Sequence, residues 1–308
     1  MVFDVIFPIL FLLALGYISV RSKGLNPEHI AALGNFVIKA ALPVLIFISL
    51  AAKNVQDIWL PQYFIVYAGV AFLLYGAAFL ICLKYFQQPF SHAAVLALGA
   101  SMSNTGMLGT AILTMLMGQQ ALTYIAPVLI IESVLMVPLV LALVAMGQQQ
   151  GVQSVKVLQQ TLLILLKNPL FIAVVLGLLC AVWGIAVPKF MQQSLSLLGQ
   201  TASPLALFVI GGGIVGMTMQ HMNLQSIVLI IFSNICMPLL VYAGLRFGVH
   251  AEQEMLYAGT IIAALPMPAM FALLGQMYGL KDKTLTPLLI STLLGFVVVG
   301  MLIAFWFG

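Results

Sequence analysis

The chain has 308 residues, of which 63% are hydrophobic and only 6% are charged, and its mean hydropathy is +1.19. A soluble domain carries about 25% charged residues, so this composition excludes a globular protein that faces water on all sides and indicates an integral membrane protein. The formal net charge of +4 does not indicate a nucleic-acid partner, because the 11 Lys and Arg residues are scattered singly and form no basic patch.

Ten apolar stretches follow one another along the chain, and each is close to the roughly 20 residues that a membrane-crossing helix needs. In the first half they lie near 3–21, 31–52, 62–84, 92–117 and 122–146. In the second half they lie near 162–184, 194–219, 224–246, 253–278 and 284–307. A polar linker, 147–161, divides the halves. We therefore predict an all-α membrane protein with one five-helix repeat over 1–146 and another over 162–308.

A shift of the sequence against itself supports this duplication. Moving the chain by 161 positions superimposes Pro8 on Pro169, Gly16 on Gly177, Pro43 on Pro204, Phe47 on Phe208 and Gly118 on Gly279. Proline and glycine mark backbone geometry, so their repetition at one offset is informative. With five helices in each half, the second half must enter the membrane from the opposite side, and this inverted repeat is common among secondary transporters.

Charge in the connections predicts the orientation. If the N-terminus lies outside, the inner connections hold most of the Lys and Arg residues, as the positive-inside rule requires. We therefore expect both termini on the outer side and the 147–161 linker in the cytoplasm. Short connections and the lack of a targeting extension favour a bacterial inner membrane.

Helix breaks are predicted at equivalent places in the fourth and ninth stretches. The fourth contains a polar, glycine-containing run at 101–110, and the ninth contains two prolines. Each proline lacks an amide donor and clashes with the preceding turn, so a continuous helix is not expected there. Freed backbone groups in paired broken helices hold ions and substrates in many transporters, although such residues also kink helices for packing alone. The candidate binding residues are Ser103, Asn104, Thr105, Gly106, Pro266, Met267 and Pro268.

Ionisable and amide side chains inside the stretches supply further candidates. Glu132 lies near the centre of the fifth stretch, and we interpret it as a carboxylate that pairs with another helix or carries a proton, with a structural hydrogen bond as the alternative. Lys39 either extends to the interface, pairs with Glu132 or attracts an anion, and its repeat equivalent is Gln200. Gln276 is a weaker candidate of the same kind. A sodium site near Asn104 and Glu132, or a proton on Glu132, would provide the coupling ion.

Other functions have less support. The Gly-Gly-Gly-Ile-Val-Gly run at 211–216 matches a dinucleotide fingerprint in letters only, because it lies inside an apolar helix, where small residues serve close packing. No catalytic residues, metal ligands or bound cofactor are expected, and an intramembrane enzyme ranks last. An anion channel and a non-transporting sensor of organic anions remain alternatives to a carrier.

Three motifs together resemble the auxin efflux carrier family, in the bacterial branch of malonate and malate permeases within the bile acid and auxin transporter superfamily. They are Pro-Val-Leu-Ile-Phe at 43–47, Ser-Asn-Thr-Gly-Met-Leu-Gly at 103–109 and Pro-Met-Pro at 266–268. The resemblance implies a scaffold domain from the first two helices of each half and a transport domain from the last three. It also implies crossing broken helices, alternating-access transport of small organic anions, and a possible homodimer through the scaffold. Asn104 and Thr105 stand where relatives place a proline.

Overall fold

The computed structural model describes residues 2–52, 60–147, 167, 169–213, 215 and 222–307, and within this part the chain contains helices and no strands. Most of the predicted 147–161 linker therefore lies outside the described residues. The first half contains α1 (Val2–Arg21), α2 (Pro27–Phe36), η1 (Val37–Ala41), α3 (Leu42–Ala51), α5 (Pro61–Lys84), α6 (Phe90–Gly99), η2 (Thr105–Gly109), α7 (Thr110–Met117), η3 (Gly118–Gln120), α8 (Ala121–Ile130), η4 (Ile131–Met136) and α9 (Val137–Gly147). The second half contains α11 (Pro169–Trp183), α12 (Lys189–Gln200), α13 (Ala202–Gly213), α14 (Leu224–Ile231), η5 (Phe232–Cys236), α15 (Met237–Ala243), η6 (Gly244–Gly248), α16 (Gln253–Ala264), α17 (Ala269–Met277) and α18 (Lys281–Phe307).

Seven helical stretches within the described residues are long and apolar enough to cross a membrane. One of them, Thr105–Gly147, has 43 residues, about twice the length that one crossing needs. It is divided at Gly118, whose φ of 63° ends α7 in a conformation that glycine adopts without strain. Shorter apolar helices cover Phe11–Arg21, Phe90–Gly99 and Pro169–Trp183. The multi-pass membrane character is thus confirmed, and the full ten-helix topology stays a prediction.

Proline positions explain several irregular turns. Three π-helical segments, η1, η4 and η5, each end two residues before a proline, namely Pro43, Pro138 and Pro238. A proline has no N–H for the carbonyl four residues earlier, and its ring pushes that carbonyl away. The ladder of hydrogen bonds widens there, which produces a π-helical turn. The same effect four residues before Pro204 accounts for the break between α12 and α13 at Thr201.

Glycines bring helices of the two halves into close contact. A Cβ atom at Gly16 of α1 would lie 1.9 Å from the Phe208 carbonyl oxygen of α13, so only glycine fits. Likewise, a Cβ at Gly177 of α11 would lie 3.1 Å from the Phe47 carbonyl oxygen of α3. Close packing through small residues is typical of membrane helices. Residues that the offset of 161 makes equivalent therefore form equivalent contacts.

The glycine run at 211–216 also packs as the sequence predicted. A Cβ at Gly211 would lie 1.9 Å from the Leu13 carbonyl oxygen of α1, and one at Gly212 would lie 2.7 Å from the Ile30 side chain of α2. The run is part of α13 as far as Gly213, with no preceding strand, and Gly216 lies outside the described residues. Gly211 and Gly212 therefore serve helix packing.

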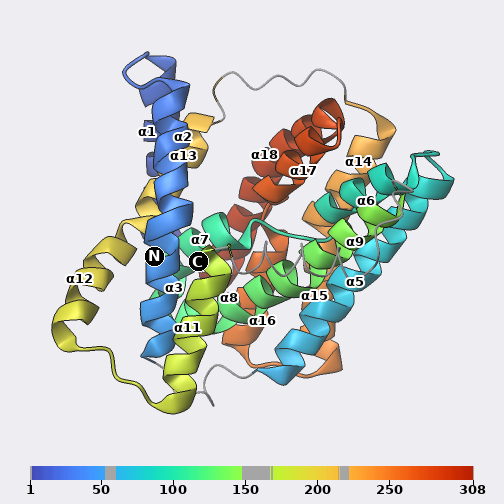
Figure 1. Cartoon of the computed structure of the whole chain (residues 1–308). Coiled ribbons are helices and arrows are strands. Elements are labelled where there is room, and N and C mark those ends of the chain that lie inside the picture. Colours follow the sequence, from blue (N-terminus) through green and yellow to red (C-terminus); the bar gives the residue numbers. More distant parts are fainter. Residues whose placement is uncertain are drawn as a thin grey trace.

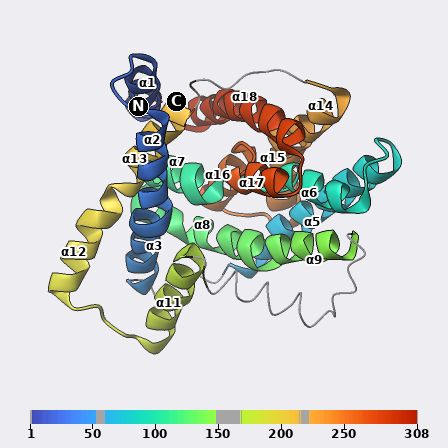
Figure 2. The same ribbon diagram turned by 45° about the horizontal axis from the view of Figure 1, so that its top comes forward.

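The helices form two groups with two short helices between them (Figures 1 and 2). One group contains α1, α2, α3, α11, α12 and α13, where α1 packs on α13 and α11 packs on α3. The other contains α5, α6, α9 and α14 to α18. Between them lie α7 and α8, and α7 contacts α13 of the first group. The Thr114 and Ser203 hydroxyls, 2.9 Å apart, join α7 to α13 by a hydrogen bond.

Candidate functional site

The two predicted helix breaks are present and meet each other. The first separates α6, which ends at Gly99, from η2, which begins at Thr105. The second separates α16, which ends at Ala264, from α17, which begins at Ala269. The backbone N–H of Asn104 donates a hydrogen bond of 2.8 Å to the carbonyl oxygen of Pro266. A direct backbone bond therefore joins two segments that lie far apart in the sequence. The place where the two breaks meet is called the crossing below.

A buried acid supports the first break. Glu132 belongs to η4 and is only 6% exposed. Its Oε1 atom accepts hydrogen bonds from the backbone N–H of Ser103 (3.2 Å) and from the hydroxyl of Thr105 (2.8 Å). The other carboxyl oxygen, Oε2, makes no hydrogen bond with any described residue. One oxygen of Glu132 thus holds the break, and the second is available to a proton or a cation.

Neutral side chains support the second break. The two prolines bring no N–H groups, so Met267 is the residue between them whose amide needs an acceptor. That amide donates to the Ser291 hydroxyl of α18 (3.0 Å), which in turn donates to Oδ1 of Asn234 in η5 (2.7 Å). The Asn234 side-chain amide donates back to the Ser291 carbonyl oxygen (3.1 Å). All hydrogen-bonding groups of this network are uncharged.

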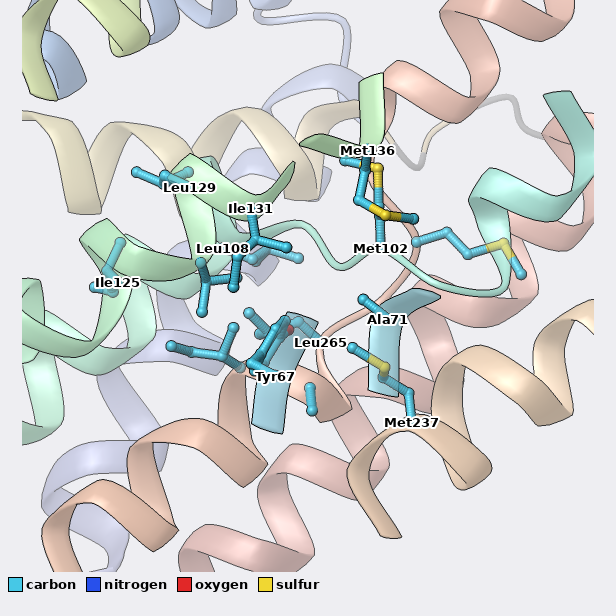
Figure 3. Packing of buried hydrophobic residues seen from close by; sticks show 14 of the residues in the cluster. Tyr67, Ala71, Met102, Leu108, Ile125, Leu129, Ile131, Met136, Met237 and Leu265 are labelled. Atoms are coloured by element: carbon cyan, nitrogen blue, oxygen red, sulfur yellow. The ribbon is translucent and has the colours of Figure 1, made fainter. Parts of the chain in front are cut away.

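The crossing is closely packed on most sides and partly open on one. Ser103, Thr105 and Met267 are buried, whereas Asn104 and Gly106 are partly exposed. A Cβ at Gly106 would lie 3.3 Å from Leu170 of α11, so Gly106 faces the first group of helices. Buried apolar residues from both groups of helices surround the crossing. Figure 3 shows Leu108, Ile131 and Leu265 in this cluster with Tyr67 of α5.

The structure does not bring every predicted residue to the crossing. Lys39 is exposed on η1 and makes no ion pair with Glu132, so that pairing is wrong. Glu132 instead bonds the first break itself. Gln200 is exposed at the end of α12 and donates to Ser196 at 3.4 Å. Gln276 belongs to α17, but its side chain lies outside the described part of the chain. No group of three or more His, Cys, Asp or Glu residues suited to a metal ion occurs within the described residues.

Sequence reasoning missed two buried residues near the helix breaks, Ser291, which bonds the second break, and Tyr67, which lies beside Ser103. Ser291 lies in an apolar helix, where a serine commonly bonds the carbonyl of its own preceding turn, and nothing in the sequence connects it to Met267. Tyr67 is 1% exposed, and its ring lies one turn from that of Tyr63, with centroids 6.0 Å apart. The only available signal was the spacing of these two tyrosines by four residues, which places them on one face of a helix.

Comparisons with known proteins agree with a transporter. A family model described as "Membrane transport protein" matches residues 1–306. A protein of Rhizobium meliloti (strain 1021) named "Putative malonate transporter" is 21% identical over 294 residues, which cover 94% of this chain and 91% of that protein. "Uncharacterized transporter YfdV" of Escherichia coli (strain K12) is 26% identical over 309 residues, which cover 96% and 94%. These similarities confirm the prediction that the chain is not an enzyme.

Proposed function

Because the chain belongs to the auxin efflux carrier family of membrane transport proteins, we propose that it is an alternating-access carrier of small carboxylates that uses Glu132 to couple transport to protons. The observation that carries this proposal is the position of Glu132. A single buried carboxyl group bonds Ser103 and Thr105 at the point where the two helix breaks meet. Any change in its protonation changes the charge beside the first break.

The two carboxyl oxygens of Glu132 have different roles. Oε1 accepts hydrogen bonds in both protonation states, so the first break keeps its support when the acid is neutral. Oε2 has no hydrogen-bond donor among the described residues, and the proton binds there. Neutralisation of a carboxylate inside a membrane protein removes a large desolvation cost. The protonated and ionised forms therefore favour different surroundings of the crossing, which is the requirement for coupling proton binding to movement.

Asn104 and the opened backbone suit a carboxylate substrate. The side chain of Asn104 is partly exposed and makes no hydrogen bond with the described residues, so its amide is free to donate. The second halves of both broken helices begin beside the crossing, at Thr105 and Ala269, and the N-terminal end of a helix favours negative charge. The malonate named for one relative is a small dicarboxylate of the expected class.

The proposed architecture has ten crossings in two inverted five-helix repeats. Its support is the offset of 161 together with the equivalent contacts of Gly16 with Phe208 and of Gly177 with Phe47. The group of α1 to α3 with α11 to α13 acts as the scaffold, through which two copies would pair. The group with the helix breaks moves against it, and the substrate binds near Gly106 between the two. On this topology both termini lie outside the inner membrane.

Counterflow in proteoliposomes tests the proposal. Purified protein is reconstituted with an unlabelled mono- or dicarboxylate inside, and the labelled acid is added outside, with and without a pH gradient or a sodium gradient. We expect saturable accumulation of at least one acid and faster net uptake when the outside is acidic. Glu132→Gln keeps an acceptor at Oε1 but removes the proton site, so we expect gradient-driven uptake to fall at least about tenfold while exchange continues.

Several outcomes contradict the proposal. Flux that does not saturate would indicate a channel, and equilibrium binding without flux would indicate a sensor. Uptake that depends on the sodium gradient alone would show that sodium, and not the proton, is the coupling ion. The control is Asp282→Asn, which removes an exposed carboxylate at the start of α18. If Glu132→Gln retains driven uptake at the level of this control, Glu132 is not the coupling residue.

A further inference from the structure

Three tyrosines form a row that runs from one end of the protein toward Glu132. Tyr63 and Tyr67 belong to α5, and Tyr124 belongs to α8. The ring centroid of Tyr63 lies 6.1 Å from that of Tyr124 and 6.0 Å from that of Tyr67. The helices α5, α8 and α16 pack against one another, and all three begin at the same end. At about 1.5 Å per residue, Tyr67 lies about 9 Å into α5.

The hydroxyl groups of the two deeper tyrosines have no partner among the described residues. Tyr63 is 0% exposed and Tyr67 is 1% exposed, and neither hydroxyl makes a hydrogen bond within this part of the chain. Leaving a buried hydroxyl unpaired is unfavourable, and most buried polar groups in proteins are therefore paired. Tyr75, on the same helix, follows the usual pattern, because its hydroxyl donates to the Ala94 carbonyl oxygen at 3.0 Å. Two adjacent exceptions at Tyr63 and Tyr67 point to a function.

The inner end of this row reaches the crossing. Both Tyr63 and Tyr67 lie near enough to Glu132 for an electrostatic interaction, and Tyr67 lies beside Ser103. The Tyr67 hydroxyl makes no hydrogen bond with a described residue, Ser103 included, so it remains available. Ser103 is the residue whose backbone N–H binds Oε1 of Glu132. The row therefore ends next to the proposed proton site.

The outer end of the row reaches exposed acids. Tyr124 is partly buried and lies beside Glu254 of α16, with Glu252 also near. Both glutamates are exposed at the start of α16. Tyr257, on the same helix, instead stacks on Trp306 with ring centroids 4.5 Å apart. Exposed carboxylates bind and release protons rapidly at a protein surface. Here two of them lie beside the outer end of the row, which we call its mouth.

We propose that Tyr124, Tyr63 and Tyr67 form a path along which protons move between the exposed Glu252 and Glu254 and the buried Glu132. A phenol hydroxyl both donates and accepts. Each one accepts a proton on one side and releases its own on the other, so no tyrosine is left charged, and one proton enters Glu132 for each proton taken from the surface. Where two hydroxyls are too far apart for a direct bond, a bridging water carries the step.

This path rests on the proposed function, because it serves the proton site at Glu132. The expected orientation places its mouth on the outer side of the membrane. The path requires the hydroxyl groups of Tyr63 and Tyr67. Neither hydroxyl makes a hydrogen bond to the substrate region at Gly106 or to the helix breaks. Their loss should slow the delivery of protons without removing the proton site.

Conservative variants test the path. Tyr63→Phe and Tyr67→Phe keep the ring packing and remove the hydroxyls, and Tyr75→Phe on the same helix is the matched control. The wild type and variants are reconstituted with a pH-sensitive dye inside, and labelled substrate is added under an inward proton gradient. We expect both proton entry and driven uptake to fall at least about tenfold in Tyr67→Phe and Tyr63→Phe. Counterflow at equal pH should stay within about twofold of wild type, which also shows that the variants are folded.

The results separate the two proposals. Full proton-driven uptake in both Tyr63→Phe and Tyr67→Phe, with the wild type driven and Glu132→Gln not, overturns the path alone. A wild type that accumulates substrate with no response to the pH gradient overturns the proton site and the path together. A loss in Tyr75→Phe equal to that in Tyr67→Phe also overturns the path, because the effect would then come from α5 as a whole. Normal proton entry in the double variant Glu252→Gln/Glu254→Gln would overturn the assigned mouth.

Discussion

The two helix breaks that meet at the centre of this protein are stabilised by opposite means. At the first break the chain keeps its amide donors and supplies acceptors, since Ser103 bonds Glu132 and Asn104 bonds the Pro266 carbonyl. At the second break prolines remove two donors, and the donor between them, on Met267, bonds a neutral serine. A break that depends on a carboxyl group responds to protons and cations. A break built from prolines and neutral hydroxyls has no such dependence.

The largest effect is expected from removing the acid completely. Glu132→Ala leaves the Ser103 amide and the Thr105 hydroxyl without an acceptor in a buried site, which costs about 2–5 kcal/mol in total. We expect a clear fall in the thermal unfolding midpoint in detergent, beyond that of Glu132→Gln, which keeps an acceptor. Equal midpoints for these two variants would show that the hydrogen bonds at Oε1 do not stabilise the first break.

A smaller effect is expected at the second break. Ser291→Ala leaves the Met267 amide without an acceptor and Oδ1 of Asn234 without a donor, which costs about 1–3 kcal/mol. The matched control is Thr292→Val, because the Leu288 carbonyl of its own helix (2.7 Å) is the only partner of the Thr292 hydroxyl among the described residues. Since no titrating group is involved, the pH profile of the remaining transport should keep its wild-type shape. A shifted profile would contradict the division between the two breaks.

These two breaks also show how far the sequence alone could lead. Repeated polar and proline residues in one register predicted where the helices stop, because such residues act locally on the backbone. The partners could not be predicted in the same way. Glu132 is 29 positions from Ser103 and Ser291 is 24 from Met267, and such contacts depend on how neighbouring helices rotate and pack. The pairing of Lys39 with Glu132, one of three alternatives for Lys39, was wrong for the same reason, since the depth of Lys39 was readable but the face of the helix was not.

Substitution of a proline tests the second break through its backbone. Pro266→Ala introduces a backbone N–H at the buried second break. We expect this added donor to stay unpaired, with a loss of about 1–3 kcal/mol. The control is Pro287→Ala within the continuous helix α18, where the new N–H meets the carbonyl four residues earlier. The thermal unfolding midpoint should fall in the first variant more than in the second. The reverse order would mean that Pro266 does not act by removing a donor.

The smallest predicted effect concerns the contact of α7, which lies between the two groups of helices, with α13 of the first group. Ser203→Ala removes the hydroxyl that bonds Thr114 across the interface of α7 and α13, while Thr114 keeps its bond to the Thr110 carbonyl. Interhelical hydrogen bonds of this kind contribute about 0.6 kcal/mol on average, which corresponds to a roughly threefold change in a conformational equilibrium. If the groups move against each other, this bond exists in only one of the two states.

Substrate affinity on the two sides of the membrane provides the measurement for Ser203→Ala. The bond favours the observed conformation, so its loss should raise the apparent KM on the side to which that conformation is open and lower it on the other, by up to about threefold each. Thr114→Val should have a similar effect, and the double variant should add little to it, because both changes remove one bond. Additive effects in the double variant, or equal shifts of KM on both sides, would mean that this interface does not rearrange during transport.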